Sequence, residues 1–413
     1  MATPISRRMF LGTTAAAVGA LAMPPVLRAQ SGPIIVGHLT PRTGFLGPMG
    51  EYAVMAADLA VEEINAKGGI LGRQIQLVKE DSINPQTATT KAERMIERDK
   101  VVAILGEISS ASALSIGQIA QRSNRLFINT GANSDTLRGV DCKRNMFHTE
   151  AQNIMYVNGE GEYLLANNLV KGKTWYMLSA DYAFGHDLRK AALAFLERNG
   201  GKLVGDELVP TDAGDFSSYM LKINAAKPDV VILNLAGTQQ AGFFKQYGEF
   251  GLNFPLGGFD FNTSMAWAAG AENFRGTWPC VWTHQVDTEA SQRFAKAFWT
   301  KYGRPPENQA WSDYVAVKIL AQAIEKTGGT KTEDLITYLE SDEAEFDILK
   351  QRKGRFTKDT HQLLQEIYAV TALPPNEVKN KWDIFTTSGP IPAGNKPLSI
   401  LTEGQVGGSC TFG

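Results

Sequence analysis

The chain alternates short apolar runs of strand length with longer stretches whose apolar residues recur every three to four positions. The first pattern is typical of strands buried on both faces, and the second is typical of amphipathic helices. The alternation occurs once before residue 150 and again after it, without a repeat of the sequence itself. Strands are predicted at 34–39, 74–80, 101–106 and 126–130, and again at 174–179, 202–208, 229–235 and 255–259. Helices are predicted at 51–66, 85–98, 109–122, 153–169, 185–198, 216–226 and 238–250.

This order predicts an α/β fold of two Rossmann-like lobes, each with a parallel sheet covered by helices on both faces. A chain of 413 residues is also longer than one hydrophobic core usually supports. Three short extended segments, at 146–150, 276–282 and 354–357, are predicted to cross between the lobes. Further helices are predicted at 289–302, 308–326 and 331–341, followed by an extended tail from 374 onward.

Two consecutive strands of the first half end in small polar residues. The run that ends at Gly106 leads into Ser109 and Ser110, which open a helix, and the next run leads into the sequence NTGAN at 129–133. The carboxyl ends of parallel strands border the crevice where ligands bind. Small residues there let a ligand approach backbone N–H groups, and a helix N-terminus favours anionic groups. We interpret this stretch as one wall of a small-molecule site.

The first residues are typical of an export signal rather than of the fold. Arg7 and Arg8 form a twin-arginine pattern, an apolar run follows at 11–23, and a cleavage position is predicted near Ala29. The apolar run is too short to span a bilayer stably, and no cysteine near the cleavage position indicates a lipid anchor. We therefore expect residues 1–29 to be a twin-arginine signal peptide and the mature protein to be periplasmic.

The charge balance weighs against some partners. Residues 1–29 contain three arginines and no acidic residue, so the whole-chain count of 41 basic and 43 acidic residues becomes 38 and 43, a net charge of −5. Nucleic acid and anionic membranes attract basic surfaces, so neither is expected as a partner.

Three cysteines suggest one disulfide. Cys142 lies in a loop of Gly, Asp and Lys, and Cys410 lies in a Gly/Ser tail, so both are expected to be exposed and to pair in the oxidising periplasm. Cys280, inside an apolar run, is expected to be a buried free thiol. No cysteine or histidine spacing matches a metal site, and neither a metal nor another cofactor is expected.

Between residues 33 and 370, a series of motifs resembles the leucine/isoleucine/valine-binding protein family, the type I periplasmic substrate-binding proteins of ABC transporters. The most specific is VEEINAKGGILGRQIQLVKED at 61–81. Weaker motifs follow in the family's order: GEISSASA at 106–113, INTGANSD at 128–135, SADYAFGHD at 179–187, GGFD at 257–260 and AAGAENFRGTW at 268–278.

The resemblance implies a periplasmic binding protein type I fold, in which three hinge strands join two lobes that close on a ligand. The first lobe is expected at 31–149 plus 283–354, the second at 150–282 plus 355–385, and a tail at 386–413 that returns to the first lobe. The implied function is solute binding for an ABC importer, without catalysis. The implied partners are a small-molecule ligand, an amino acid or a small carboxylate, and the permease subunits. We expect a monomer.

The resemblance also assigns roles in the first lobe. Ser110 matches the family's carboxylate-binding serine, and Ser109 beside it is either a helix cap or a second contact. Gly131, Ala132 and Asn133 match positions that contact the ligand head group, unless they only form a turn. The family often has Thr where this chain has Asn133, whose amide can still donate to a carboxylate.

Apolar and aromatic residues in two loops, and one acid, complete the predicted site. Phe45 and Met49 lie in the predicted first loop, where relatives place an apolar lid, although both residues can instead pack locally. Phe184 aligns best with the family's ligand-covering tyrosine, and Tyr182 can supply a hydroxyl, unless both pack at a helix start. Asp260 matches the acid that pairs with the ligand's α-ammonium; its alternative role is a helix cap. An enclosed carboxylate needs a partner, so we expect an amino acid, branched-chain or otherwise apolar, or a related amino-containing solute.

Other functions stay open at this point. An aromatic or short carboxylic acid, or an amide such as urea, is the alternative ligand, with a flat pocket formed by Phe45, Tyr182, Phe184, Phe261 and Trp311. A periplasmic sensor that docks on a membrane receptor is a second alternative. An exported enzyme is disfavoured because none of the five histidines stands in a nucleophile pattern with Ser or Cys.

Overall fold

The computed structural model describes residues 32–412. The predicted signal peptide lies outside these residues. Within them, no helix combines the length and the apolar character that crossing a membrane requires.

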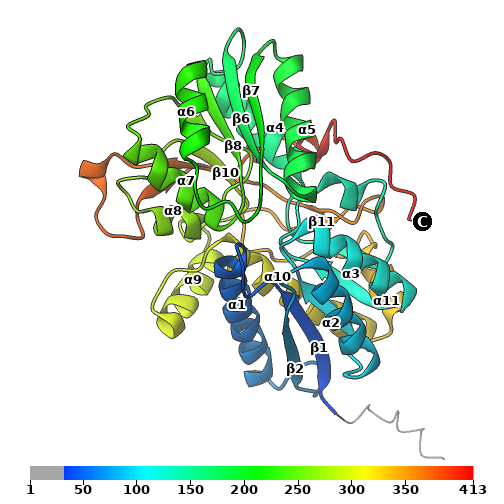
Figure 1. The fold of residues 1–413 in the computed structure, drawn as a ribbon. Coiled ribbons are helices and arrows are strands. Elements are labelled where there is room, and N and C mark those ends of the chain that lie inside the picture. The colour runs from blue at the N-terminus through cyan, green and yellow to red at the C-terminus, as the bar shows by residue number, and fades with distance from the viewer. Residues whose placement is uncertain (1–31, 413) are drawn as a thin grey trace, which may run out of the picture. The chain divides into compact units, whose positions relative to one another are not determined.

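The first lobe is built on a five-stranded parallel sheet (Figure 1). Its strands in spatial order are β2 (Ile75–Asp81), β1 (Ile34–Thr40), β3 (Ala103–Gly106), β4 (Leu126–Asn129) and β5 (Met146–His148). The segment at 146–150, predicted as a crossover, thus begins as the edge strand of this sheet. Because the central strands are buried on both faces, they consist of continuous apolar residues rather than alternating ones.

Helices from two distant parts of the chain cover this sheet. The first part supplies α1 (Gly47–Ala66), α2 (Pro85–Glu97) and α3 (Ser110–Arg122), and the later part supplies α9 (Glu289–Tyr302), α10 (Asn308–Thr327) and α11 (Thr332–Leu339). Helix α1, blue in Figure 1, packs along α10, in yellow, and both share one apolar core with the sheet. Helices α2 and α3 share a second core with the opposite face.

The second lobe repeats the plan with a four-stranded parallel sheet. Its strands in spatial order are β7 (Lys202–Val209), β6 (Thr174–Ala180), β8 (Val230–Asn234) and β9 (Leu256–Gly257). Its helices are α4 (Asn153–Ala166), α5 (Ala183–Arg198), α6 (Ser217–Ala226), α7 (Thr238–Glu249) and α8 (Thr263–Ala269). Successive strand residues face opposite sides, so Trp175 and Met177 pack with α4 and α5, whereas Tyr176 and Leu178 pack with α6 and α7.

Three segments join the lobes. After β5 the chain enters α4. Farther along, β10 (Thr277–Cys280) pairs antiparallel with β13 (Tyr368–Ala372), which pairs with β14 (Phe385–Thr387). The third crossover does not lie at 354–357, where it was predicted. There β11 (Arg355–Phe356) forms a hairpin with β12 (Leu363–Leu364), and Gln362 bridges to His148 of β5 in the first-lobe sheet. The exact division into lobes predicted above stays a prediction.

Two helices start earlier than predicted, α1 by four residues and α5 by two. Helix α1 begins at Gly47 instead of residue 51, because Pro48 suits a first helical turn, where its missing N–H costs no hydrogen bond. Met49 therefore lies in a helix, and its assignment to a loop is wrong. Strand β9 is shorter than predicted.

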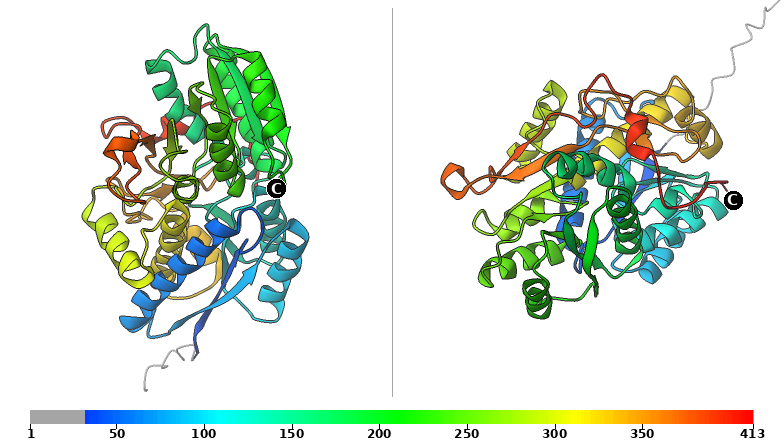
Figure 2. Two further views of the ribbon diagram at one scale, coloured as in Figure 1. Left: turned by 60° about the vertical axis from the view of Figure 1, so that its left-hand side comes forward. Right: turned by 90° about the horizontal axis from the view of Figure 1, so that it is seen from above.

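The tail after residue 374 contains β14 and two 3₁₀ turns, η2 (Pro375–Glu377) and η3 (Leu398–Thr402). Figure 2 follows it, in red, from η3 beside α4 to the C-terminus near the first-lobe helices. Cys142 and Cys410 form the predicted disulfide, and Cys280 is a buried free cysteine. Cys142 is buried rather than exposed, because the returning tail covers it.

Candidate functional site

A small cavity lies where strand ends of both sheets face each other. Its lining includes six of the ten predicted site residues: Met49, Gly131, Asn133, Tyr182, Phe184 and Asp260. The cavity measures only about 10 Å³, space for about one water molecule, so a larger solute requires the lobes to move apart. We call this cavity and its lining the crevice.

The other four predicted residues do not line the crevice. Ser109 is the N-cap of α3, where its hydroxyl accepts a hydrogen bond from Ser112 N (3.4 Å). Ser110 is buried, and its hydroxyl accepts from Ser134 N (3.3 Å). Ala132 is buried in the turn after β4, and Phe45 packs its ring edge-on against Tyr182, with centroids 5.7 Å apart.

Glu107 occupies the position that sequence reasoning left for an anionic ligand. It follows Gly106 with a φ of 74°, an unusual angle for a residue other than glycine. This backbone turn brings its carboxyl group back to accept hydrogen bonds from Ile108 N (3.0 Å) and Ser109 N (2.8 Å). Two N–H groups beside the start of α3 are therefore bonded to the protein's own acid. Burial raises the pKa of Glu107 to about 8.

Gly131 and Gln309 meet on the first-lobe wall. A Cβ atom at Gly131 would lie 2.4 Å from Gln309 Oε1, so the chain has space there only for glycine. Gln309 is fixed in turn, because its Nε2 donates to Thr130 O (3.1 Å) and to Asp313 Oδ2 (2.7 Å). Asp313 also contacts His38 Nε2 at 2.8 Å. This buried network holds a side-chain amide at the crevice.

Asp260 lies after β9 and forms the acidic part of the second-lobe wall. Helix α8 has Asn262, not Asp260, at its N-cap position, so the alternative role of Asp260 as that cap is not observed. Its carboxylate makes no ion pair within residues 32–412, and no Lys or Arg lines the crevice. Burial, reinforced by the negative charge of Glu150, raises the pKa of Asp260 to about 8.

Glu150 is a second acid in the crevice, which sequence reasoning missed. It follows β5 at the first crossover, and its Oε1 accepts hydrogen bonds from Tyr156 Oη (2.5 Å) and Ala151 N (2.8 Å). Burial raises the pKa of Glu150 to about 7. Together with Asp260 it places two carboxyl groups in the crevice lining.

The other lining residues that sequence reasoning missed come from segments far apart in the chain. They are Leu46, Ile108, Tyr156, Ala236, Asn262, Asn308 and Gln309. Asn308 and Gln309 open α10 after Pro305, Pro306 and the N-cap residue Glu307. Polar residues at a helix start after two prolines were the available signal, but only the fold shows that this start faces Gly131.

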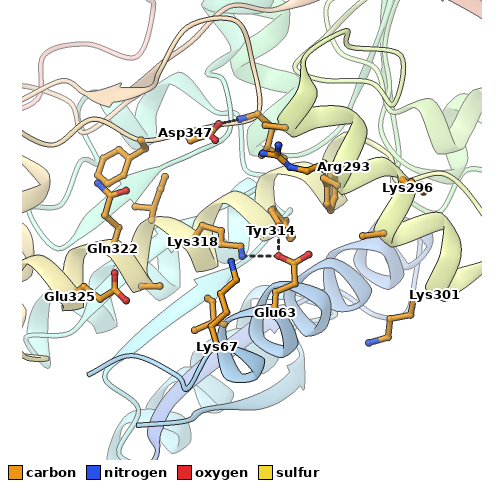
Figure 3. Close-up of a pocket in the computed structure, with 18 of the residues that line it drawn as sticks. Glu63, Lys67, Arg293, Lys296, Lys301, Tyr314, Lys318, Gln322, Glu325 and Asp347 are labelled. Atoms are coloured by element: carbon orange, nitrogen blue, oxygen red, sulfur yellow. Dashed lines mark hydrogen bonds and ion pairs between the residues drawn. The ribbon is translucent and has the colours of Figure 1, made fainter. Parts of the chain in front are cut away.

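A larger hollow, of about 970 Å³, lies between α1, α9 and α10 (Figure 3). Glu63 bonds there to Tyr314 Oη (2.5 Å) and Lys318 Nζ (2.8 Å). No predicted site residue lines it. All three helices belong to the core of the first lobe, so closure of the lobes does not enclose this hollow.

Solved structures share this fold. A periplasmic binding protein from Burkholderia mallei has a TM-score of 0.80 and 26% identity, covering 87% of this chain and 95% of that one. A branched-chain amino acid ABC transporter periplasmic ligand-binding protein from Burkholderia xenovorans has a TM-score of 0.74 and 26% identity, with 87% and 95% covered. A solute-binding protein from R. palustris, solved with benzoate, has a TM-score of 0.77 and 23% identity, covering 87% of this chain and 96% of that one. At this identity the likeness concerns the fold alone.

Two parallel-sheet lobes with a small crevice between their strand ends define a solute-binding protein of the type I class. The chain belongs to the periplasmic binding protein family, which it matches over residues 33–374. It is 27% identical to Leu/Ile/Val-binding protein homolog 7 of Brucella melitensis, over 72% of this chain and 78% of that one. Its relatives are solute-binding proteins of ABC transporters rather than enzymes, and the family is periplasmic and works with permease components.

Proposed function

We propose that this protein binds an amino-bearing solute, an amino acid above all, between its two lobes and delivers it to an ABC importer. The observation that carries the proposal is Asp260, a buried carboxylate that lines the crevice without an ion-pair partner among the described residues. Such a group is costly to bury unless it is protonated or paired. An ammonium group on the solute supplies the pair.

The crevice disfavours a solute that is only an anion. Glu150 and Asp260 both line it, and its lining contains no Lys or Arg. Glu107 already accepts hydrogen bonds from two of the N–H groups beside α3. A simple carboxylate would meet repulsion from both lining acids wherever they are ionised, and without a compensating cation.

An apolar surface beside these acids supports a solute with an aliphatic part. Leu46, Met49, Ile108 and Phe184 supply it, and all four are buried. We propose amino acids with aliphatic side chains, branched-chain ones included. The proposed roles of Ser109, Ser110, Ala132 and Phe45 are supporting ones, because these residues do not line the crevice. We also propose export by the twin-arginine route.

The aromatic-acid alternative loses part of its predicted pocket. Phe261 and Trp311 are fully buried in the hydrophobic cores, outside the crevice lining. Tyr182 and Phe184 remain, with ring centroids 5.6 Å apart. These two rings and that of Tyr156 stand beside two acids in the crevice lining, and this combination fits an amino-bearing solute better than a benzoate-like one.

Isothermal titration calorimetry tests the proposal. The purified protein is titrated with the standard amino acids, benzoate and urea. We expect micromolar or tighter binding of at least one amino acid, which corresponds to about −8 kcal/mol. Asp260→Ala should weaken it at least tenfold, and Asp215→Ala, on the exposed surface, should not. Binding of benzoate but of no amino acid contradicts the proposal.

A further inference from the structure

We propose that Glu150 is a second cation-binding carboxylate of the crevice, and that the solute carries a terminal amino or guanidino group in addition to its α-ammonium. This inference rests on the proposed function, because it assumes that Asp260 pairs with the α-ammonium. Among the amino acids it selects the basic ones, with an aliphatic stem and a charged end, over those with a purely aliphatic side chain.

Only one oxygen of the Glu150 carboxylate is committed to the protein. Oε1 accepts from Tyr156 Oη and Ala151 N, which fixes the orientation of the group. No hydrogen bond joins Oε2 to any residue of the described chain, although Glu150 is 3% exposed and lines the crevice. A carboxylate held by one oxygen leaves the other free to accept from a ligand.

The two nearby basic residues are engaged elsewhere. Arg138 donates to the main-chain oxygens of Ala132, Ser134 and Glu150 and to Gln362, not to the Glu150 carboxylate. Lys350 donates to Gln365 Oε1 (2.7 Å) and Glu366 O (2.8 Å), with its ammonium 4.2 Å from the Trp311 ring centroid. Neither forms an ion pair with Glu150, so within residues 32–412 this acid has no ion-pair partner.

Two acids in one crevice exceed what a single ammonium can neutralise. Burial raises the pKa of Glu150 to about 7, against the lowering effect of Lys350 and Arg138. The charge of Glu150 raises the pKa of Asp260 and of Glu307, the N-cap residue of α10. A solute with one ammonium leaves Glu150 without a cationic partner, whereas a second cation pairs with the carboxylate and displaces the proton from the fraction that is protonated.

The lining between the acids suits a basic amino acid. Its methylene stem can lie against Met49, Ile108 and Phe184. The side-chain amide of Asn262, whose Oδ1 has no hydrogen-bond partner among the described residues, can bond to a polar end of the solute.

Lysine and norleucine provide the matched test, because they have the same carbon chain and differ in the terminal ammonium. By calorimetry at pH 7 we expect lysine to bind at least tenfold tighter than norleucine. Titrations in buffers of different ionisation enthalpy should show that lysine binding releases more protons. Glu150→Gln should weaken lysine binding at least tenfold and change norleucine binding less than threefold.

Glu160→Gln is the control, because Glu160 is also a buried acid but lies outside the crevice lining; it should leave both affinities unchanged. Equal affinities for lysine and norleucine in the unmodified protein overturn the inference while the proposed function stands. If Glu150→Gln weakens the binding of lysine and of norleucine equally, Glu150 only supports Tyr156 structurally, and the inference is also overturned. Failure to bind any amino acid overturns both proposals.

Discussion

Asp187 of α5 accepts a hydrogen bond from the hydroxyl of Ser134, in the turn after β4, and so ties a second-lobe helix to a first-lobe loop. The same carboxylate accepts from Thr136 N (3.1 Å). These bonds exist only while the lobes are together, so they stabilise the closed arrangement.

Asp187→Ala should therefore shift the protein toward the open arrangement. A hydrogen bond to a charged group contributes about 1.5–3 kcal/mol, and a loss at the low end weakens solute affinity about tenfold. Calorimetry measures the affinity, and small-angle scattering should show a larger radius of gyration. Asp181→Ala is the control, because Asp181 pairs with His186 inside the second lobe (2.7 Å). An unchanged radius and affinity would contradict the role of Asp187.

Solute affinity should increase with pH. The pKa of Asp260 is raised to about 8 by burial, so this acid is largely protonated at pH 6 and ionised above pH 8. Since only the ionised form pairs with an ammonium, affinity should rise from pH 6 to pH 8 by up to tenfold per unit. Asp260→Asn should flatten the profile. A benzoate-like anion predicts the opposite slope, so a decline over this range would reject an ammonium-bearing solute.

Glu107 should make the fold less stable as pH rises. Its pKa is about 8 in the folded protein and about 4.3 in an unfolded chain. The folded state thus binds more protons between these values, and the free energy of unfolding falls as pH increases through that window. Glu107→Gln removes this ionisation, so its Tm relative to the unmodified protein should rise from pH 5 to pH 9. Glu249→Gln, at an exposed position, is the control. In calorimetric scans its Tm should differ from that of the unmodified protein by the same amount at every pH.

Gly131→Ala should weaken solute binding at least tenfold. The added methyl group would lie 2.4 Å from Gln309 Oε1, which forces Gln309 out of its bonds to Thr130 and Asp313. Gly214→Ala is the control, since no atom lies within 4 Å of the corresponding Cβ position. Titrations of both variants, checked by circular dichroism, measure the effect; equal affinities would show that Gln309 does not position the site.

Replacing Cys142 and Cys410 by serine should lower the free energy of unfolding by about 2–4 kcal/mol, because the bond restricts a long loop of the unfolded chain. Denaturant unfolding measures this. A reducing agent should lower the Tm of the unmodified protein and leave the double variant unchanged. If the reducing agent lowers the Tm of the unmodified protein and of the double variant equally, the effect does not come from this disulfide.

The order of elements was largely predictable from the sequence, because buried parallel strands and amphipathic helices have distinct apolar patterns. Strands β3 and β4 consist of uninterrupted buried residues, and their short length and flanking turn residues distinguish such runs from buried helices. Short pairings were harder to predict. Strand β11 has two residues, and its partner depends on tertiary contacts that no local pattern carries.

The site was predicted in part. Gly131 and Asp260 lie at strand ends, where the fold class alone directs attention, and both line the crevice. Glu150 and Gln309 were missed, because their place in the crevice depends on the crossover and on a helix that begins 179 residues after the end of β4. Glu107 was missed as well, since its role arises from a positive φ angle that no sequence motif indicates.

The returning tail has a mechanical consequence. Asn158 of α4 holds the main chain at Leu401 (2.9 Å), and Lys190 of α5 holds Val406 O (2.8 Å). A few residues later Cys410 is covalently attached to Cys142. The tail is thus attached to both lobes, and a short glycine-containing run connects the two attachments. The length of this run limits how widely the lobes can separate, and so sets an upper bound on the size of solute that can be admitted.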